Sequence, residues 1–152
     1  AARGYVKVVA TAVEHGADVN VQDAEGYSPL LWAVGWGHVE VVVTLVEHGA
    51  DVNVQDAHGY SPLHRAAKRG DVEVVAALVE LGADVQAVTA CGDTPLHLAS
   101  NAAAVTLLLE AGADLHRRNH DGNTPLFEAI RDGRSSAVTA LVQAGARPKA
   151  SD

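Results

Sequence analysis

A period of 33 residues is the feature that most constrains how this chain can fold. The pentapeptide Gly26-Tyr27-Ser28-Pro29-Leu30 returns in related form at Gly59, Gly92 and Gly122, with offsets of 33, 33 and 30 residues. A second phrase, Gly-Ala-Asp, begins at residues 16, 49, 82 and 112 and keeps the same spacing. Self-similarity at this period is typical of a stack of small units, each of which contacts only its neighbours.

The unit at residues 26–58 predicts a short first helix. Ser28 is a residue type favoured as an N-cap, and Pro29 suits the first helical position, where its missing N–H costs no hydrogen bond. We expect this helix to run from Pro29 to Trp36. Gly37 then allows a tight reversal of the chain, because glycine tolerates backbone angles that other residues avoid.

A second helix is predicted over residues 39–48. Its β-branched valines favour an isolated helix poorly, so tertiary packing must stabilise it. Gly49 supplies the left-handed residue that ends the helix. Residues 50–59 are rich in Asp, Asn and Gly, and we expect them to form a hairpin-like loop that projects from the helix pair.

The phrase Ser61-Pro62-Leu63-His64-Arg65-Ala66 and its copy at residues 94–99 resemble the ankyrin repeat, as do the Gly-x-x-Glu-Val-Val and Gly-Ala-Asp-Val-Asn phrases. The resemblance covers essentially the whole chain. It implies an all-α ankyrin-repeat solenoid of stacked helix-turn-helix units with projecting β-hairpin loops. It also implies a concave surface of first helices and hairpin tips, and a convex back of second helices. In the family, the histidine after Pro-Leu bonds to the neighbouring hairpin, so His64 and His97 are expected struts; Leu31 and Phe127 would replace the strut with packing.

On this pattern we expect a single ankyrin repeat domain over residues 1–152. A partial repeat with only a second helix and hairpin occupies residues 1–25, and full repeats occupy 26–58 and 59–91. A shortened repeat follows at 92–121, and the C-terminal repeat occupies 122–152.

The third repeat lacks three residues where Trp36-Gly37-His38 stands in the first. We expect its first helix to be clipped, and Asn101 to adopt the left-handed conformation in place of the missing glycine, because Asn tolerates that region. The deletion is either a neutral change in a surface loop or a dent in the concave face that shapes partner selection.

The two ends of the chain also depart from the pattern. Residues 2–9 align with residues 35–42, and no first helix precedes them. We therefore expect Val6, Val9 and Val13 to face nothing, and we infer that the chain is a fragment or that upstream residues are missing. A more polar helix over residues 135–143, stopped by Arg147-Pro148-Lys149, is expected to close the stack.

Composition excludes several classes of partner. A formal net charge of −8 argues against nucleic acid and anionic membranes, since both select clustered Lys and Arg. The longest apolar runs are far shorter than a bilayer span, and no signal-peptide or lipidation pattern is present. The lone cysteine, Cys91, is typical of a reducing compartment. We expect an intracellular protein, cytoplasmic or nuclear.

Chemistry at a metal or catalytic centre is not indicated. His15 and His48, like His64 and His97, lie 33 residues apart and so occupy the same position in successive repeats. Cys91 has no nearby cation to lower its pKa, and no nucleophile elbow, phosphate loop or zinc-helix motif is present. We expect no enzyme activity, no metal and no cofactor.

The positions that vary between repeats indicate where specificity lies. Tyr27, Trp36, Tyr60, Lys68 and Arg69 are predicted to form a contiguous aromatic and basic patch on an otherwise acidic protein, and Trp, Tyr and Arg are enriched at binding hot spots. Trp32 and Arg65 extend this patch if they are exposed; the competing interpretation places Trp32 in the core. The full set of predicted partner-binding residues is Tyr27, Trp32, Trp36, His58, Tyr60, Arg65, Lys68, Arg69, Asp93, Asn101, Asn123 and Arg131.

We therefore expect a monomeric module that binds another protein through the concave surface. One alternative is a stand-alone inhibitor or an engineered ankyrin binding scaffold, which the nearly identical first two repeats favour. The short third repeat and its divergent Val88-Thr89 argue against full design.

Overall fold

The computed structural model describes the backbone of residues 2–146 and the side chains of residues 6–146. Within these residues the chain forms nine helices and no strand, so the predicted all-α fold is confirmed. The helices are α1 (Ala2–Glu14), α2 (Pro29–Trp36), α3 (Val39–Glu47), α4 (Pro62–Arg69), α5 (Val72–Glu80), α6 (Pro95–Leu98), α7 (Ala102–Glu110), α8 (Pro125–Arg131) and α9 (Ser135–Gln143).

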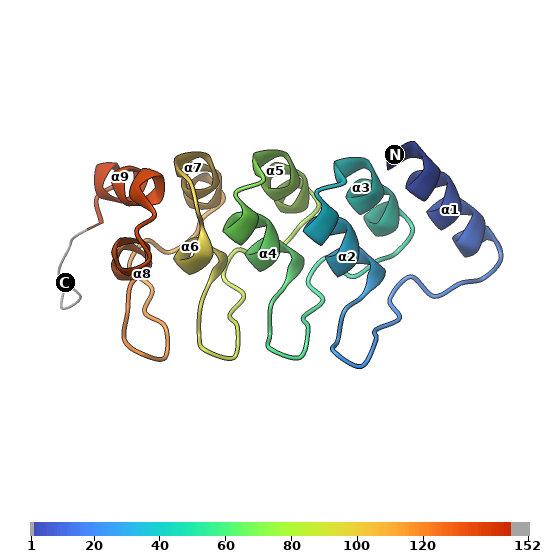
Figure 1. The fold of residues 1–152 in the computed structure, drawn as a ribbon, viewed down its shortest axis with the longest axis horizontal. Helices are drawn as coiled ribbons and strands as arrows, with labels where there is room; N and C mark the ends of the chain where they lie inside the picture. The colour runs from blue at the N-terminus through green and yellow to red at the C-terminus, as the bar shows by residue number, and fades with distance from the viewer. Residues whose placement is uncertain (1, 147–152) are drawn as a thin grey trace.

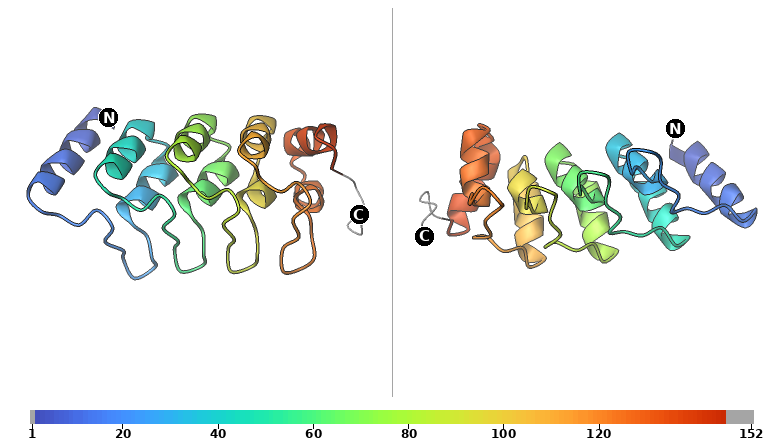
Figure 2. Two further views of the ribbon diagram at one scale, coloured as in Figure 1. Left: turned by 180° about the vertical axis from the view of Figure 1, so that it is seen from behind. Right: turned by 90° about the horizontal axis from the view of Figure 1, so that it is seen from below.

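The helices lie in two rows (Figures 1 and 2). The first helices of the repeats, α2, α4, α6 and α8, form one row, and the second helices, α1, α3, α5, α7 and α9, form the other. The loops between repeats project beyond the row of first helices (Figure 1). None of the helices in this described part combines the length and hydrophobicity needed to span a bilayer.

Local sequence explains where the first helices begin. Ser28 has an extended backbone, and its hydroxyl accepts a hydrogen bond from the Leu31 N–H at 3.4 Å. Pro29 occupies the first helical position, and Gly37 ends the helix with a φ of 72°. The predicted bounds of this helix are confirmed. The second helix ends at Glu47, one residue before the predicted end.

The core lies between the two rows. The first helices bury Leu30, Leu31, Leu63, Leu96 and Leu126, and the second helices α3, α5, α7 and α9 bury Leu45, Leu78, Leu108 and Leu141. Burying such a side chain contributes about 1.5–3 kcal/mol. Alanines at the equivalent first-helix positions, such as Ala33 and Ala66, are also buried and allow neighbouring helices to approach closely.

The projecting loops are hairpin-shaped turns without β-strands in the described residues. In each loop one side-chain oxygen accepts two backbone N–H groups; Asp56 accepts from His58 at 2.9 Å and from Tyr60 at 3.0 Å. Successive loops are also joined, as where Ala90 N–H donates to the His58 carbonyl at 3.0 Å. Gly59 makes this contact possible: its φ is +83°, and a Cβ there would lie 2.9 Å from the Ala90 nitrogen.

The expected histidine struts are confirmed. His64 Nε2 lies 2.8 Å from the Asp93 carbonyl oxygen, and His97 Nε2 lies 2.9 Å from that of Asn123. Both rings are fully buried. At the equivalent position of the first repeat Leu31 is buried, whereas Phe127 in the last repeat is partly exposed.

The shortened repeat confirms one prediction and corrects another. α6 is clipped to four residues, as expected. The prediction of a left-handed Asn101 is wrong: its φ is −144°, and its side chain caps α7 by accepting the Ala104 N–H at 2.8 Å. Asn101 therefore occupies the N-cap position that Asp71 holds in the preceding repeat. The deletion removes the end of the first helix together with the glycine that follows it. No residue is therefore required to take the left-handed conformation in place of that glycine.

The expectation about the exposed valines of α1 is also corrected. Val6 and Val9 pack against the core, and Val13 is partly buried, because α1 lies along α3. Val8 is the valine that α1 exposes, with 64% of its surface accessible. The predicted helix over residues 135–143 is confirmed as α9. The stop predicted at Arg147-Pro148-Lys149 lies outside the described residues.

Candidate functional site

Three aromatic side chains form a continuous row along α2 and its loop. The ring centroids of Tyr27 and Trp32 are 5.6 Å apart, and those of Trp32 and Trp36 are 5.8 Å apart. The interpretation of Trp32 as a core residue is wrong, since it is 49% exposed. The buried positions of α2 are residues 30, 31, 33 and 34, so residues 32 and 36, one turn apart, share the opposite, exposed face.

Arg65 joins this aromatic row to the next repeat. Its guanidinium carbon lies 4.8 Å from the Tyr27 ring centroid and 5.5 Å from that of Tyr60. The same group donates to the Tyr27 hydroxyl at 3.0 Å and to Asp56 Oδ2 at 2.5 Å. Two tyrosines and a carboxylate therefore hold one guanidinium in a fixed position, with its charge neutralised by Asp56.

Asp56 is the residue that organises this contact. Burial alone would raise the pKa of its carboxyl group. Hydrogen bonds from Arg65 and from the Tyr60 and His58 N–H groups outweigh burial and lower the pKa. The carboxylate is therefore ionised at neutral pH and remains the partner of Arg65.

Lys68 and Arg69 follow one turn later on α4. The Lys68 Nζ atom lies 5.9 Å from the Tyr60 ring centroid, and Arg69 donates to the Gly35 carbonyl at 2.7 Å. Both side chains are exposed, and in the described part of the chain neither forms an ion pair. These two cations are available to a negatively charged partner.

Two adjoining hollows lie between α2 and α4. The first, of about 380 Å³, is largely apolar and is lined by Tyr27, Leu31, Trp32, Gly35 and Arg65. The second, of about 600 Å³, is lined by Gly35, Arg65, Lys68 and Arg69. They share Gly35 and Arg65, and a Cβ added at Gly35 would meet no neighbouring atom. An apolar recess thus opens directly onto a cationic one.

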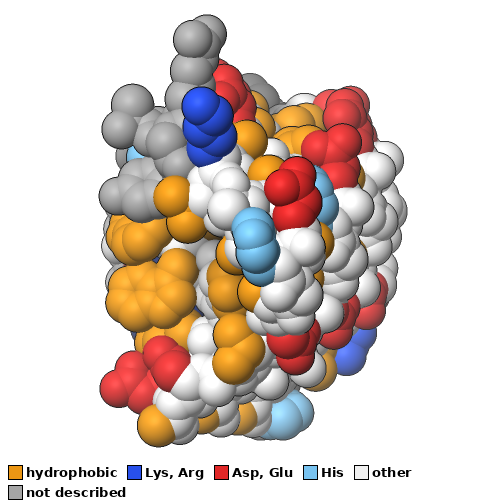
Figure 3. All heavy atoms as spheres, turned by 90° about the vertical axis from the view of Figure 1, so that its right-hand side faces the viewer, with side chains coloured by type: hydrophobic (Ala, Val, Ile, Leu, Met, Phe, Trp, Pro, Cys, Tyr) orange, Lys and Arg blue, Asp and Glu red, His pale blue; other side chains and the backbone are white. Residues whose placement is uncertain are grey.

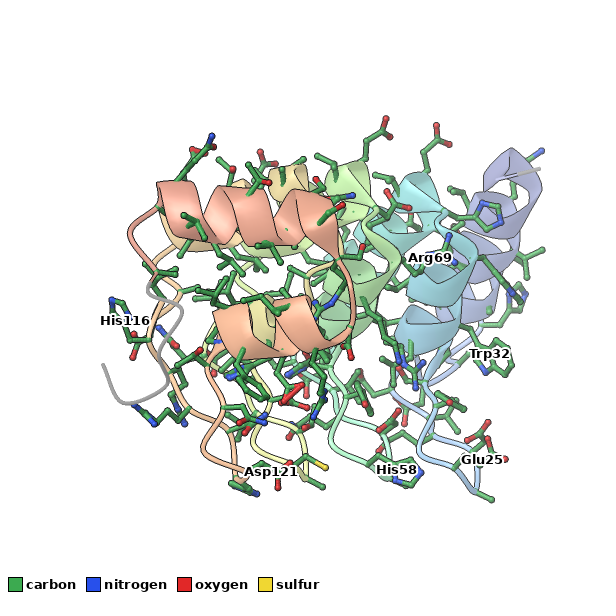
Figure 4. The ribbon with its side chains drawn as sticks, turned by 60° about the vertical axis from the view of Figure 1, so that its left-hand side comes forward. Glu25, Trp32, His58, Arg69, His116 and Asp121 are labelled. Atoms are coloured by element: carbon green, nitrogen blue, oxygen red, sulfur yellow. The ribbon has the colours of Figure 1, made fainter. Side chains whose placement is uncertain are left out.

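We call Tyr27, Trp32, Trp36, Tyr60, Arg65, Lys68 and Arg69 the aromatic–basic patch. Figure 4 shows Trp32 and Arg69 on this side of the molecule, with Glu25, His58 and Asp121 at the loop tips. His58 is exposed at its tip, close in sequence to the patch. The structure thus brings the predicted residues of the first two repeats together.

The other predicted residues lie in later repeats and have partners within the chain. Asp93 accepts a hydrogen bond from Asn119 at 2.8 Å, and Asn101 caps α7. Asn123 donates to Glu128 at 3.0 Å, and Arg131 forms an ion pair with the same carboxylate. Asp93 nevertheless lies near the aromatic–basic patch, since burial and then the charge of Asp93 raise the pKa of Tyr60.

Sequence reasoning missed two contributors to this surface. Asp56 was recognised only as a turn residue, and its pairing with Arg65 leaves no simple motif in the sequence. Gly35 contributes to both hollows because it has no side chain. The one available signal was that the equivalent position carries Lys68 in the second repeat.

The described residues contain no group of three or more His, Cys, Asp or Glu side chains placed to hold a metal ion. Cys91 is exposed near a loop tip. His15 and His48 make the same bond, each placing Nδ1 within 2.8 Å of the carbonyl oxygen four residues earlier. This agreement supports their interpretation as one repeated structural position.

Comparison with known proteins identifies the family of the 33-residue repeat. The model of ankyrin repeats (3 copies) matches residues 1–89 and again residues 63–152. The chain is 48% identical to Protein fem-1 homolog A of Danio rerio over 44 residues. This matched segment makes up 29% of this chain and 7% of that protein. The chain is 41% identical to ADP-ribosylation factor GTPase-activating protein AGD2 of Arabidopsis thaliana over 46 residues. This matched segment makes up 30% of this chain and 6% of that protein. The chain thus spans only a small part of either relative.

Proposed function

The chain belongs to the ankyrin repeat family, whose repeats generally act as protein–protein interaction modules, and we propose that it binds a partner protein through the aromatic–basic patch. The observation that carries this proposal is the apolar hollow beside Trp32 that opens onto Lys68 and Arg69. A surface with an apolar recess and two cations without acidic partners is suited to protein recognition.

The chemistry of the hollows defines the partner. An apolar side chain would fill the recess beside Trp32 and Tyr27, and a carboxylate next to it would reach Lys68 and Arg69. Arg65 contributes shape more than charge, because Asp56 already neutralises it. The proposed ligand is therefore an acidic protein segment with one apolar anchor, bound by a monomer inside the cell.

We assign no chemistry to the chain itself. The GTPase-activating activity in the name of the Arabidopsis relative belongs to that protein, of which this chain matches 6%. Nucleic acid is an unsuitable ligand for a protein with a formal net charge of −8.

A stand-alone inhibitor or an engineered binding scaffold is the second candidate. Its support is the phrase DVNVQDA-x-GYSPL, which is identical at all but one position in the first two repeats. In either case the same patch contacts the ligand, so one experiment tests both.

The test is affinity capture from lysate followed by binding measurements on the captured partner. Lys68→Glu/Arg69→Glu reverses both cations of the patch and should weaken binding at least about ten-fold. The matched control, Arg117→Glu/Arg118→Glu, makes the same charge change on two exposed residues of a later loop and should bind normally. Circular dichroism confirms that both variants are folded. Equal loss in the two variants, or none in the first, would place the interface elsewhere.

A further inference from the structure

Gly35 is a glycine that the local backbone does not explain. Among residues 6–146, every other glycine has a positive φ, a conformation that favours glycine. Gly35 has no positive φ and lies inside α2. Glycine inside a helix is unfavourable, since relative to alanine it lowers the folding equilibrium constant by about two- to five-fold. The conformation of α2 therefore gives no reason for a glycine at this position.

Packing does not require a glycine there either. A Cβ added at Gly35 would have no neighbouring heavy atom within 4 Å. Arg69 donates to the Gly35 carbonyl at 2.7 Å, but this bond uses the backbone and stays possible when position 35 carries a side chain. The equivalent positions of the second and last repeats carry Lys68 and Arg131, both exposed. The fold thus accommodates long side chains at this place, and what Gly35 provides is open space.

This open space joins the two hollows of the aromatic–basic patch. The apolar hollow of about 380 Å³ and the cationic hollow of about 600 Å³ have Gly35 and Arg65 in common. The Arg65 guanidinium is held in place by Tyr27 and Asp56. A side chain at position 35 would project into the junction of the hollows, so its absence lets one ligand occupy both.

The positions of the hollows define the spacing within that ligand. On α4 the apolar hollow is lined by Arg65, whereas the cationic hollow extends to Lys68 and Arg69. The two hollows are therefore offset by about one helical turn, roughly 5 Å along the helices. In an extended segment, side chains two positions apart share one face and are separated by about 6.6 Å. An extended segment that passes over Gly35 can place one such side chain in each hollow.

Charge decides which side chain enters the cationic hollow. Lys68 and Arg69 supply its charge, because Asp56 already neutralises Arg65. The protein as a whole has a formal net charge of −8. On the end of the stack that carries α1, shown in Figure 3, acidic side chains predominate over basic ones among the described residues. An acidic side chain is thus attracted to this hollow and repelled by much of the remaining surface.

We propose that Gly35 is the specificity-determining residue of the aromatic–basic patch, and that it accommodates an extended partner segment with an apolar and an acidic side chain two positions apart. The apolar side chain lies beside Tyr27 and Trp32. The acidic one reaches Lys68 and Arg69, and the main chain between them passes over Gly35. This inference rests on the proposed function and adds the spacing within the ligand and the residue that enforces it.

Selection from a library of random linear peptides displayed on phage tests the spacing. The bait is the whole chain, and prior passage over Lys68→Glu/Arg69→Glu removes peptides that bind elsewhere. We expect the enriched peptides to carry Asp or Glu two positions from Leu, Ile, Met or Phe. Enrichment of a spacing of three or four, as on one face of a helix, would overturn the extended segment.

Substitutions of Gly35 separate shape from charge, with fluorescence anisotropy of a dye-labelled enriched peptide as the readout. Gly35→Gln fills the junction with a neutral side chain and should weaken binding at least about ten-fold. Gly35→Lys should also weaken it, although it adds a cation. A tighter complex with Gly35→Lys would mean that charge alone decides, and would overturn the proposal. The control, Gln143→Lys, adds the same charge at an exposed position of α9 and should bind normally.

Stability gives a readout that does not depend on the ligand. Gly35→Ala should raise the urea midpoint, with an increase of about two- to five-fold in the folding equilibrium constant. Circular dichroism checks that Gly35→Gln and Gly35→Lys are folded. A destabilised Gly35→Ala would show that the fold itself requires glycine at this position, against the proposal.

Failure of this inference and failure of the proposed function give different results. Peptides that depend on Lys68 and Arg69 but bind Gly35→Gln normally would remove the role of Gly35 and leave the proposed function intact. A library that yields no peptide dependent on Lys68 and Arg69 would overturn both.

Discussion

At the scale of single residues, His64 and His97 each join two repeats through one imidazole ring. In both, Nε2 faces a carbonyl oxygen of the next loop, so Nε2 must carry the proton. Nδ1 faces the backbone N–H of the helix N-cap at 3.1 Å, so Nδ1 must accept. Protonation would direct a second N–H at that donor. The ring is therefore suited to its position only when it is neutral.

This geometry predicts that stability falls in mild acid. Burial, only partly offset by hydrogen bonding to the loop carbonyl, lowers the pKa of both histidines below the ordinary value of 6.5. The unfolded chain therefore takes up protons first as the pH falls below 6.5. The free energy of unfolding should decrease by up to about 1.4 kcal/mol per pH unit for each histidine. Urea unfolding between pH 7.5 and 5.5 measures this slope.

The control variant comes from the chain itself, because Leu31 stands at the equivalent position of the first repeat. His64→Leu and His97→Leu should each be less stable at pH 7.5 and should each remove one histidine's share of the slope. An unchanged slope in both variants would assign the acid sensitivity to other groups.

At the scale of elements, the shortened repeat shows how a deletion is accommodated. α6 has a single turn, and its end is completed by a residue of the next repeat. Arg134 donates to the Ala99 carbonyl at 2.6 Å and to the His97 carbonyl at 2.9 Å. Ser100 and Asn101 attach the connecting segment to the preceding repeat, through the Ala67 and Gly70 carbonyls. Side-chain bonds to both neighbours thus replace the missing helical turn.

Arg134 should therefore be important for stability although it follows no repeat motif. Arg134→Ala leaves two carbonyl groups at the end of α6 without their charged donor, and should lower the free energy of unfolding by about 2–3 kcal/mol. Chemical denaturation followed by circular dichroism measures the change. Arg118→Ala, which removes one exposed side chain with a single 3.3 Å bond to Gly122, should change it by less than about 0.5 kcal/mol. Equal effects would mean that α6 does not depend on Arg134.

At the scale of the whole molecule, the stack is stabilised by contacts between neighbours only. α4 packs against α2, α5 and α6, whereas α1 packs against α3 and lacks a first helix beside it within the described chain. In such an array the end units open more easily than the middle ones.

Native-state hydrogen exchange should reveal this gradient. We expect the amides of α4 and α5 to exchange slowest and those of α1 fastest, with protection factors that differ by at least about ten-fold. Exchange followed by mass spectrometry of peptic fragments resolves individual repeats. Uniform protection along the chain would show that the repeats open together as one cooperative unit.

The sequence alone was sufficient for the period and for the bounds of the first helix at residues 29–36, while the histidine struts were expected from the resemblance to the ankyrin repeat. N-caps such as Ser28, the prolines that follow them and glycines such as Gly37 act within a few residues of their own position. Their effects can therefore be read locally. A repeated unit then gives every copy the same neighbours.

Only the tertiary structure decided the features that break the repeat. The exposure of Trp32, the pairing of Asp56 with Arg65 and the completion of α6 by Arg134 all depend on which side chains meet. Arg134 reaches a carbonyl 35 residues away in the chain. A residue that departs from the repeat pattern has no second copy with which to compare it, so its partners are set by packing alone.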